Sequence, residues 1–108
     1  MNFSLENDEP ENNVTQERVP FLFEWKGQGS EVFIVGSFSH WSAFFEMKKN
    51  EETGAFEIEI LLPRGKHSFK FKVDQKFVCN DQYPIMIDYH NHKVNFIDLT
   101  NFNIEKKN

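Results

Sequence analysis

The sequence predicts an all-β protein, an antiparallel β-sandwich, and three observations support this fold class. Apolar and polar residues alternate with period two from Val19 onward, which is typical of strands that bury one face. Turn-forming residues recur at regular spacing over about 80 residues, and no segment has the period of a convincing helix. The 108 residues fit one domain, and 13 of them are Phe, so bulky rings supply the area that a small core must bury.

The strands expected in the first half are each bounded by turn residues. They cover residues 19–25, residues 31–37 and a short segment around Met47. The first strand turns Phe21, Phe23 and Trp25 to one face, and the glycines of residues 27–30 form the turn that follows. The loop over residues 38–42 is polar apart from its two aromatic residues.

The strands expected in the second half alternate more regularly. They cover residues 56–62, 67–73, 77–78 and 94–99. The alternation over residues 67–73 predicts that His67, Phe69, Phe71 and Val73 face in and that Ser68, Lys70 and Lys72 face out. Residues 56–62 place Ile58 and Ile60 inward and Glu57 and Glu59 outward, and we interpret the two carboxylates as a solvated face. A tight hairpin is expected at residues 74–75, and a loop interrupted by Pro84 is expected from residue 80 to residue 92.

The acidic excess lies at the N-terminus. Residues 1–17 contain five of the 17 Asp and Glu and no Lys or Arg, whereas the remaining 12 acids are balanced by 12 bases. We expect residues 1–18 to form an extended acidic arm that is flexible unless a protein partner holds residues 1–17. Residues 19–99 form the sandwich and residues 100–108 a polar end. A neutral domain with an acidic arm argues against nucleic-acid binding, which needs a basic face.

The chain has one cysteine, Cys79, so no internal disulfide is expected. No apolar stretch approaches the length that spans a bilayer, and the N-terminus lacks the pattern of a secretory signal. We therefore expect no membrane partner and a cytoplasmic location.

No motif in the sequence indicates an enzyme. A glycine-rich phosphate loop, a nucleophile elbow and a paired metal-ligand motif are all missing. Cys79 could act as a nucleophile with His67 or His90, but an inert packing role is favoured. His90 and His92 could bind a metal, yet no further ligands stand at suitable spacing, so we expect an ordinary polar loop. The prediction is a non-catalytic protein without metal or cofactor.

Trp41 is the most informative side chain, because a polar loop seldom carries an indole. One interpretation is that Trp41 folds back and covers the edge of the sandwich. The other is that it offers a flat surface on which the C–H face of a sugar ring packs, worth about 1–3 kcal/mol by buried area. Such a site needs further contacts, because one stacked ring alone gives only about millimolar affinity.

Several runs of the sequence resemble one known family. They are FEW at residues 23–25, EVFIVGSFSHWS at residues 31–42, LPRGKHSFKFKVD at residues 62–74, Pro84-Ile85, and VNFI at residues 94–97. Over residues 19–99 the chain is similar to the glycogen-binding domain of AMP-activated protein kinase β subunits, carbohydrate-binding module family 48. The resemblance implies an immunoglobulin-like β-sandwich of the early-set type and non-catalytic binding of α-1,4-linked glucans such as glycogen and starch.

The resemblance also implies a carbohydrate-binding surface. Trp41 matches the first sugar-stacking tryptophan of the family, and Phe77 stands where the family has its second. Lys70 matches the lysine that hydrogen-bonds sugar hydroxyls, and Asn95 matches an asparagine of the last strand. The loop that inserts a leucine into the glucan ring corresponds to residues 89–91, where no leucine stands.

Two functions follow from these observations. The first is an α-glucan-binding module that uses Trp41, Lys70, Phe77 and Asn95. The second is a protein-interaction or structural subunit of a large assembly, for example cytoskeletal or ciliary, that reuses the sandwich with an altered sugar site. Because few residues follow the domain, we expect a module rather than a complete β subunit. Exposure of the Trp41 indole in the assembly discriminates between the two functions, because an indole buried under another chain would favour the structural role.

Overall fold

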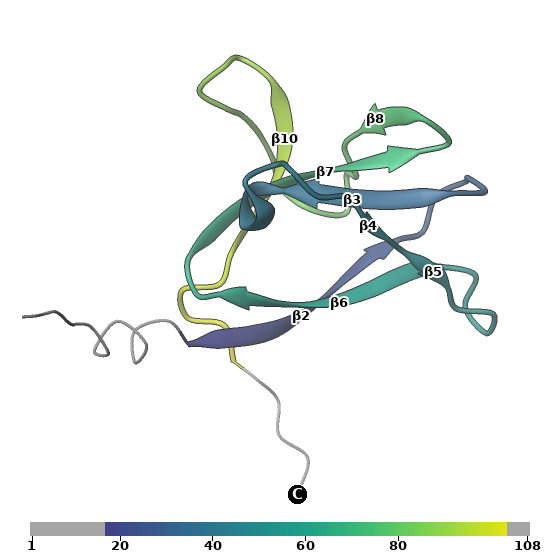
Figure 1. Cartoon of the computed structure of the whole chain (residues 1–108), viewed down its shortest axis with the longest axis horizontal. Coiled ribbons are helices and arrows are strands. Elements are labelled where there is room, and N and C mark those ends of the chain that lie inside the picture. The colour runs from purple at the N-terminus through teal and green to yellow at the C-terminus, as the bar shows by residue number, and fades with distance from the viewer. Residues whose placement is uncertain (1–16, 104–108) are drawn as a thin grey trace, which may run out of the picture.

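The computed structural model describes residues 17–103, which form two antiparallel sheets packed face to face (Figure 1). The larger sheet has the order β4-β3-β7-β10-β9, with β8 paired to β7, and the smaller has the order β2-β6-β5. The strands are β2 (Arg18–Trp25), β3 (Val32–Gly36), β4 (Phe45–Glu46), β5 (Lys48–Lys49), β6 (Phe56–Pro63), β7 (Lys66–Val73), β8 (Lys76–Val78), β9 (Ile85–Ile87) and β10 (Lys93–Asp98). The predicted all-β sandwich is confirmed.

Phenylalanine rings from both sheets meet in the core. Phe23 of β2 and Phe69 and Phe71 of β7 are fully buried, and the Phe23 and Phe69 ring centroids lie 4.9 Å apart. Burial of one such ring contributes about 1.5–3 kcal/mol. The inward positions predicted from period two on β2, β6 and β7 are confirmed, because these side chains belong to the core or pack against it.

The structure differs from the sequence prediction in two places. Strand β9 lies inside the segment predicted as a loop, since Ile85-Met86-Ile87 is too short and too uniformly apolar to show a period. The strand expected around Met47 is divided into β4 and β5, which belong to different sheets. The chain thus crosses between the sheets at Met47, whose side chain is buried.

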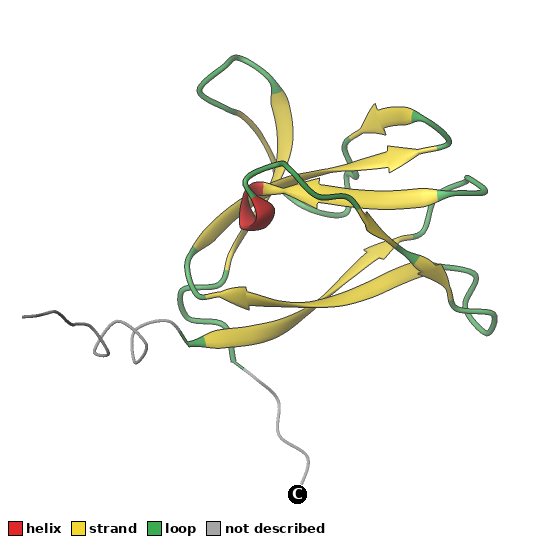
Figure 2. Ribbon diagram, in the orientation of Figure 1, coloured by secondary structure: helices red, strands yellow, loops and turns green. Residues whose placement is uncertain are grey.

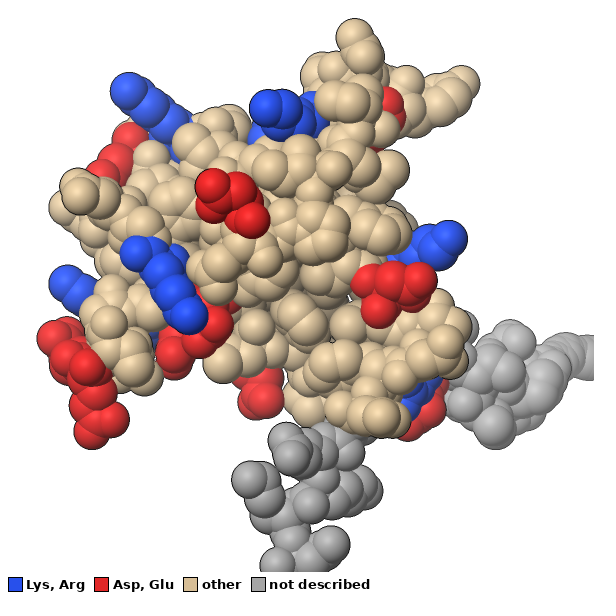
Figure 3. Space-filling model, turned by 180° about the vertical axis from the view of Figure 1, so that it is seen from behind, with Lys and Arg blue, Asp and Glu red and all other residues tan. Residues whose placement is uncertain are grey.

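The acidic arm predicted for residues 1–18 lies almost entirely outside the described residues, as does most of the polar end at residues 100–108. Within residues 17–103, no helix is long and apolar enough to cross a membrane. A short helical turn, η1 (Ser37–Ser39), follows β3 and is red in Figure 2. On the face seen in Figure 3, Lys and Arg side chains are interspersed with Asp and Glu.

The hairpin between β7 and β8 is tied to the turn between β2 and β3. Asp74 and Gln75 at its tip both have positive φ, 48° and 78°, which confirms the tight turn predicted there. The Asp74 carboxylate accepts hydrogen bonds from the backbone N–H groups of Ser30 (3.0 Å) and Glu31 (2.9 Å). These bonds fix the hairpin that carries Phe77.

Gly29 in the same corner tolerates no side chain. Its φ is +143°, and a Cβ there would meet Val73 Cγ1 at 2.5 Å. We predict that Gly29→Ala lowers the free energy of unfolding by about 1–3 kcal/mol more than Gly54→Ala does. Gly54 also has positive φ (+82°), but a Cβ there meets nothing within 4 Å. Urea denaturation of both variants measures the difference, and equal destabilisation would contradict the packing argument.

Candidate functional site

A strained loop at the end of β3 presents Trp41. His40 and Trp41 have φ of 55° and 61°, in the left-handed region that bulky residues rarely adopt. The loop is held by backbone hydrogen bonds from Trp41 N to Gly36 O (2.9 Å) and from His40 N to Ser37 O (3.0 Å). Backbone strain of this kind persists only where the surroundings determine it, and it gathers at functional sites. The Trp41 side chain is 40% exposed.

Gly36 makes this loop possible by its lack of a side chain. A Cβ at this position would lie 2.5 Å from the Phe38 ring and 2.6 Å from the backbone oxygen of Ser68. Phe38 therefore packs directly over the end of β3 and against the core. The close approach of loop and strand leaves the Trp41 indole on the outer face of the larger sheet.

Trp41, Lys70 and Phe77 line one hollow of about 340 Å³ on that face. They come from three elements: the loop after β3, strand β7 and strand β8. The remaining lining residues are Asp88, His90, His92 and Val94. Two aromatic rings with a lysine and further polar groups suit a ligand that has flat apolar faces and many hydroxyls at its edges.

Phe77 is surrounded by cations and by a second exposed ring. Its side chain is 53% exposed, and Lys70 Nζ and Lys72 Nζ lie 5.9 and 5.8 Å from its ring centroid. The Phe44 ring lies 6.1 Å away at an angle of 46°. Cation–π attraction of about 0.5–1 kcal/mol at such exposed sites holds each lysine close to the rings.

A turn over residues 88–92 forms one wall of the hollow. The Asp88 carboxylate accepts hydrogen bonds from the backbone N–H groups of His92 (2.8 Å) and His90 (2.9 Å). These hydrogen bonds, of which the one from His92 has the larger effect, hold the pKa of Asp88 below its ordinary value. The His90 and His92 ring centroids are 6.3 Å apart. Within residues 17–103, His, Cys, Asp and Glu form no group of three that could hold a metal ion.

Asn95 lies in the interior rather than on the predicted carbohydrate-binding surface. Its side chain is fully buried, because in the register of β10 with β7 it opposes the inward-facing Phe69. Asn95 Oδ1 accepts a hydrogen bond from Asn80 N (2.7 Å), and Asn95 Nδ2 donates to Asn80 O (2.7 Å). Nδ2 also lies 3.3 Å from the backbone oxygens of Tyr83 and Pro84. Asn95 therefore holds the segment before β9.

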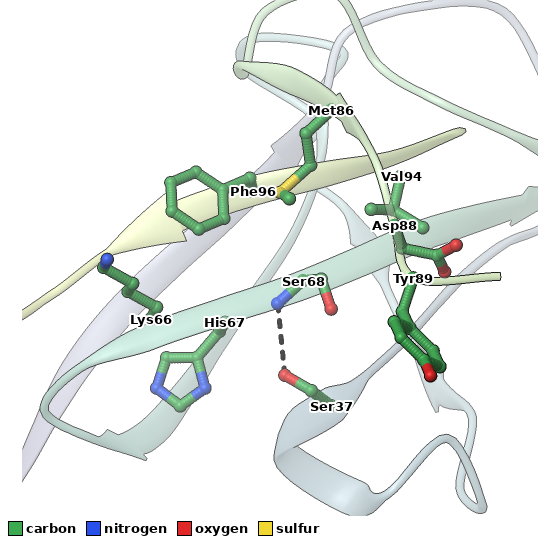
Figure 4. A pocket seen from close by; sticks show the side chains of 9 residues that line it. All are labelled: Ser37, Lys66, His67, Ser68, Met86, Asp88, Tyr89, Val94 and Phe96. Atoms are coloured by element: carbon green, nitrogen blue, oxygen red, sulfur yellow. Dashed lines mark hydrogen bonds between the residues drawn. The ribbon is translucent and has the colours of Figure 1, made fainter. Parts of the chain in front are cut away.

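A second hollow of about 260 Å³ lies on the other side of the 88–92 turn. Figure 4 shows Lys66 and Phe96 at one end and Asp88 and Tyr89 at the other. Ser68 N donates a hydrogen bond to Ser37 Oγ (3.1 Å) along its floor. Asp88 and Val94 line both hollows, so the turn divides one continuous stretch of surface.

Two of the side chains considered for catalysis, His67 and Cys79, each lie against a backbone oxygen. His67 is buried, with Nε2 2.7 Å from the backbone oxygen of Pro63. The Cys79 thiol lies 3.4 Å from the backbone oxygen of Lys93. The contact of Cys79 fits the packing role favoured from the sequence.

Sequence reasoning assigned no binding role to several side chains of this surface. Phe44 precedes the short strand expected around Met47 and was given no role of its own. Asp88, His90 and His92 were placed in an ordinary polar loop. The available signal was the position of this loop, since residues 89–91 correspond to the family loop that contacts glucan.

Comparison with known proteins places most of the chain in one family. The sequence profile described as "glycogen recognition site of AMP-activated protein kinase" matches residues 19–105. The chain is 30% identical over 81 residues to the 5'-AMP-activated protein kinase subunit beta of Schizosaccharomyces pombe, covering 75% of this chain and 26% of that protein. It is 30% identical over 82 residues to the SNF1 protein kinase subunit beta-2 of Saccharomyces cerevisiae, covering 75% of this chain and 20% of that protein.

A mammalian relative matches a slightly shorter segment. The human 5'-AMP-activated protein kinase subunit beta-2 is 36% identical over 72 residues, which cover 67% of this chain and 26% of that protein. The chain thus spans about a quarter of the length of the relatives that it matches.

The buried amide of Asn95 gives a stability prediction. Asn95→Ala should lower the free energy of unfolding by about 2–4 kcal/mol, because it leaves the N–H and C=O of Asn80 buried without partners. Chemical denaturation measures the loss. Asn101→Ala, at an exposed position, is the control and should change stability by less than about 0.5 kcal/mol. A loss of similar size in both variants would contradict the structural role of Asn95.

The Asp88 carboxylate gives a pH prediction. Its pKa in the folded protein lies below the ordinary 3.8, so the ionised form stabilises the turn at higher pH and is lost only as pH falls below 3.8. The backbone amide NMR signals of His90 and His92 should shift together with that low midpoint. Asp88→Asn should remove the shift. A midpoint at or above 3.8 would show that the two hydrogen bonds do not stabilise the charged form.

Proposed function

The chain belongs to the family of AMP-activated protein kinase glycogen-recognition domains, and on that premise we propose that it binds α-linked glucose polymers without acting on them. The observation that supports this proposal is the meeting of Trp41, Lys70 and Phe77 around one hollow. They come from separate elements, so their juxtaposition depends on the fold.

The proposed contacts follow from the chemistry of a pyranose ring. One face of such a ring presents C–H groups, which pack on the indole of Trp41 and on the ring of Phe77. The hydroxyls at its edge accept hydrogen bonds from Lys70 Nζ. They also form hydrogen bonds with polar groups of the 88–92 turn. Phe77 offers less area than a tryptophan, so the share of binding that falls to Trp41 is large.

Exposure of the indole in the single chain leaves it available to a sugar, as glucan binding requires. Within the described part of the chain Trp41 is 40% exposed and faces the hollow instead of covering the edge of the sandwich. The relatives named above are kinase subunits, which gives no support to a cytoskeletal or ciliary structural subunit.

The names of the relatives support a kinase as protein partner, so that the domain would bring a kinase to a glucan store. The protein partner expected for residues 1–17 and the cytoplasmic location remain predictions of the sequence.

Co-sedimentation with glycogen tests the proposed function. The wild-type protein should pellet with glycogen, and Trp41→Ala should lose about 1–3 kcal/mol of binding, roughly 5- to 150-fold in affinity. Phe77→Trp should bind more tightly than wild type, because a larger ring covers more of the sugar.

Leu22→Ala is the matched control, since Leu22 is also an exposed apolar residue but belongs to β2 in the smaller sheet. It should pellet like wild type. A wild-type protein that stays in the supernatant, and whose NMR spectrum is unchanged by β-cyclodextrin, would overturn the proposal.

A further inference from the structure

We propose that Phe44 and Lys72 form an additional subsite next to the hollow, so that the domain favours long glucan chains over short ones; this inference rests on the proposed function. Nothing in the sequence analysis assigned a role to either residue. The subsite would receive sugar units of the same chain that extend beyond Phe77.

Phe44 is a large apolar side chain left open to solvent. It is 45% exposed and directly precedes β4, the strand at one edge of the larger sheet. Strand β4 pairs with β3, so Phe44 stands two strands away from β7, which carries Lys70 and Lys72. Phe44 and Phe77 are exposed side by side, and a contiguous exposed apolar patch is typical of a binding site.

The Phe44 ring is continuous with the hollow through Phe77. Phe77 lines the hollow, and its ring centroid is 6.1 Å from that of Phe44. The two rings are tilted by 46°, so they form a bent surface instead of a flat one. A helical glucan chain is itself curved, and successive sugar faces can meet rings that are inclined to each other.

The subsite repeats the chemistry of the site beside it. Lys70 Nζ lies over Phe77, and Lys72 Nζ lies 5.0 Å from the centroid of Phe44. Both lysines project from the outer face of β7, two residues apart. Each aromatic ring is thus paired with a cationic donor that can reach hydroxyls at the edge of a stacked sugar. This repetition favours a further sugar unit over an apolar peptide, which would leave both ammonium groups without acceptors.

Chain-length dependence of binding tests the proposal. Isothermal titration with maltotriose and maltoheptaose should show tighter binding of the longer chain by the wild-type protein. Phe44→Leu keeps an apolar side chain but removes the flat ring. It should weaken maltoheptaose binding by about three- to tenfold and leave maltotriose binding unchanged.

The controls separate the subsite from the fold and from the main site. Phe44→Tyr retains the ring and should retain the preference for maltoheptaose. Leu61→Ala changes an exposed residue (59%) on β6 of the other sheet and should alter neither affinity. Thermal unfolding of all variants checks that each one is folded.

The outcomes distinguish the two proposals. A wild-type protein that binds neither oligosaccharide overturns the proposed function. A wild-type protein that binds both, with Phe44→Leu weakening both equally, means that Phe44 only supports Phe77 and overturns the subsite. Unchanged binding of both ligands in Phe44→Leu overturns it as well.

Discussion

The antiparallel register between β3 and β7 determines both what the sandwich buries and what it displays. Ile34 opposes Phe71 and Gly36 opposes Phe69 on the inner face, whereas Val35 opposes Lys70 on the outer face. A slip of one residue would exchange the faces, placing lysines in the core and phenylalanines in water. The cost of such an exchange fixes the register, and the register places Lys70 and Lys72 beside the aromatic rings. The core therefore specifies the site.

The alternation that specifies the core is visible in the sequence, and the parts predicted from it are confirmed. Phe69 and Phe71 were placed inside and Lys70 outside on period two alone. Strand β9 was missed because three consecutive apolar residues carry no period. Phe44 received no role because its place beside Phe77 depends on a contact between residues far apart in the sequence, which the local pattern does not show. The sequence left open whether Trp41 covers the edge of the sandwich or faces solvent, because the answer depends on a loop with positive φ.

Asn95 shows why a resemblance predicts positions more reliably than roles. The residue lies in the expected strand, but its amide hydrogen-bonds the backbone of Asn80 instead of facing solvent. Tyr83 belongs to the same segment and ties it to the smaller sheet, because its hydroxyl accepts a hydrogen bond from Glu24 N of β2 (2.8 Å). Burial raises the pKa of the Tyr83 hydroxyl, consistent with a group enclosed between the sheets. The buried Asn95 and the partly buried Tyr83 thus anchor the segment that leads to the 88–92 turn and the wall of the hollow.

On the outer face, the exposed ring of Phe44 offsets the smaller ring that Phe77 offers to a sugar. A phenylalanine at position 77 covers less of a sugar than a tryptophan would, and taken alone it argues for weaker binding. Phe44, however, places a second ring 6.1 Å away, and Lys72 lies over both rings. Two smaller rings inclined to each other present more total area than one indole, but over a longer span. A single sugar unit covers one ring, whereas a chain of several units can cover both. Such an arrangement trades affinity for a single sugar against selectivity for the polymer.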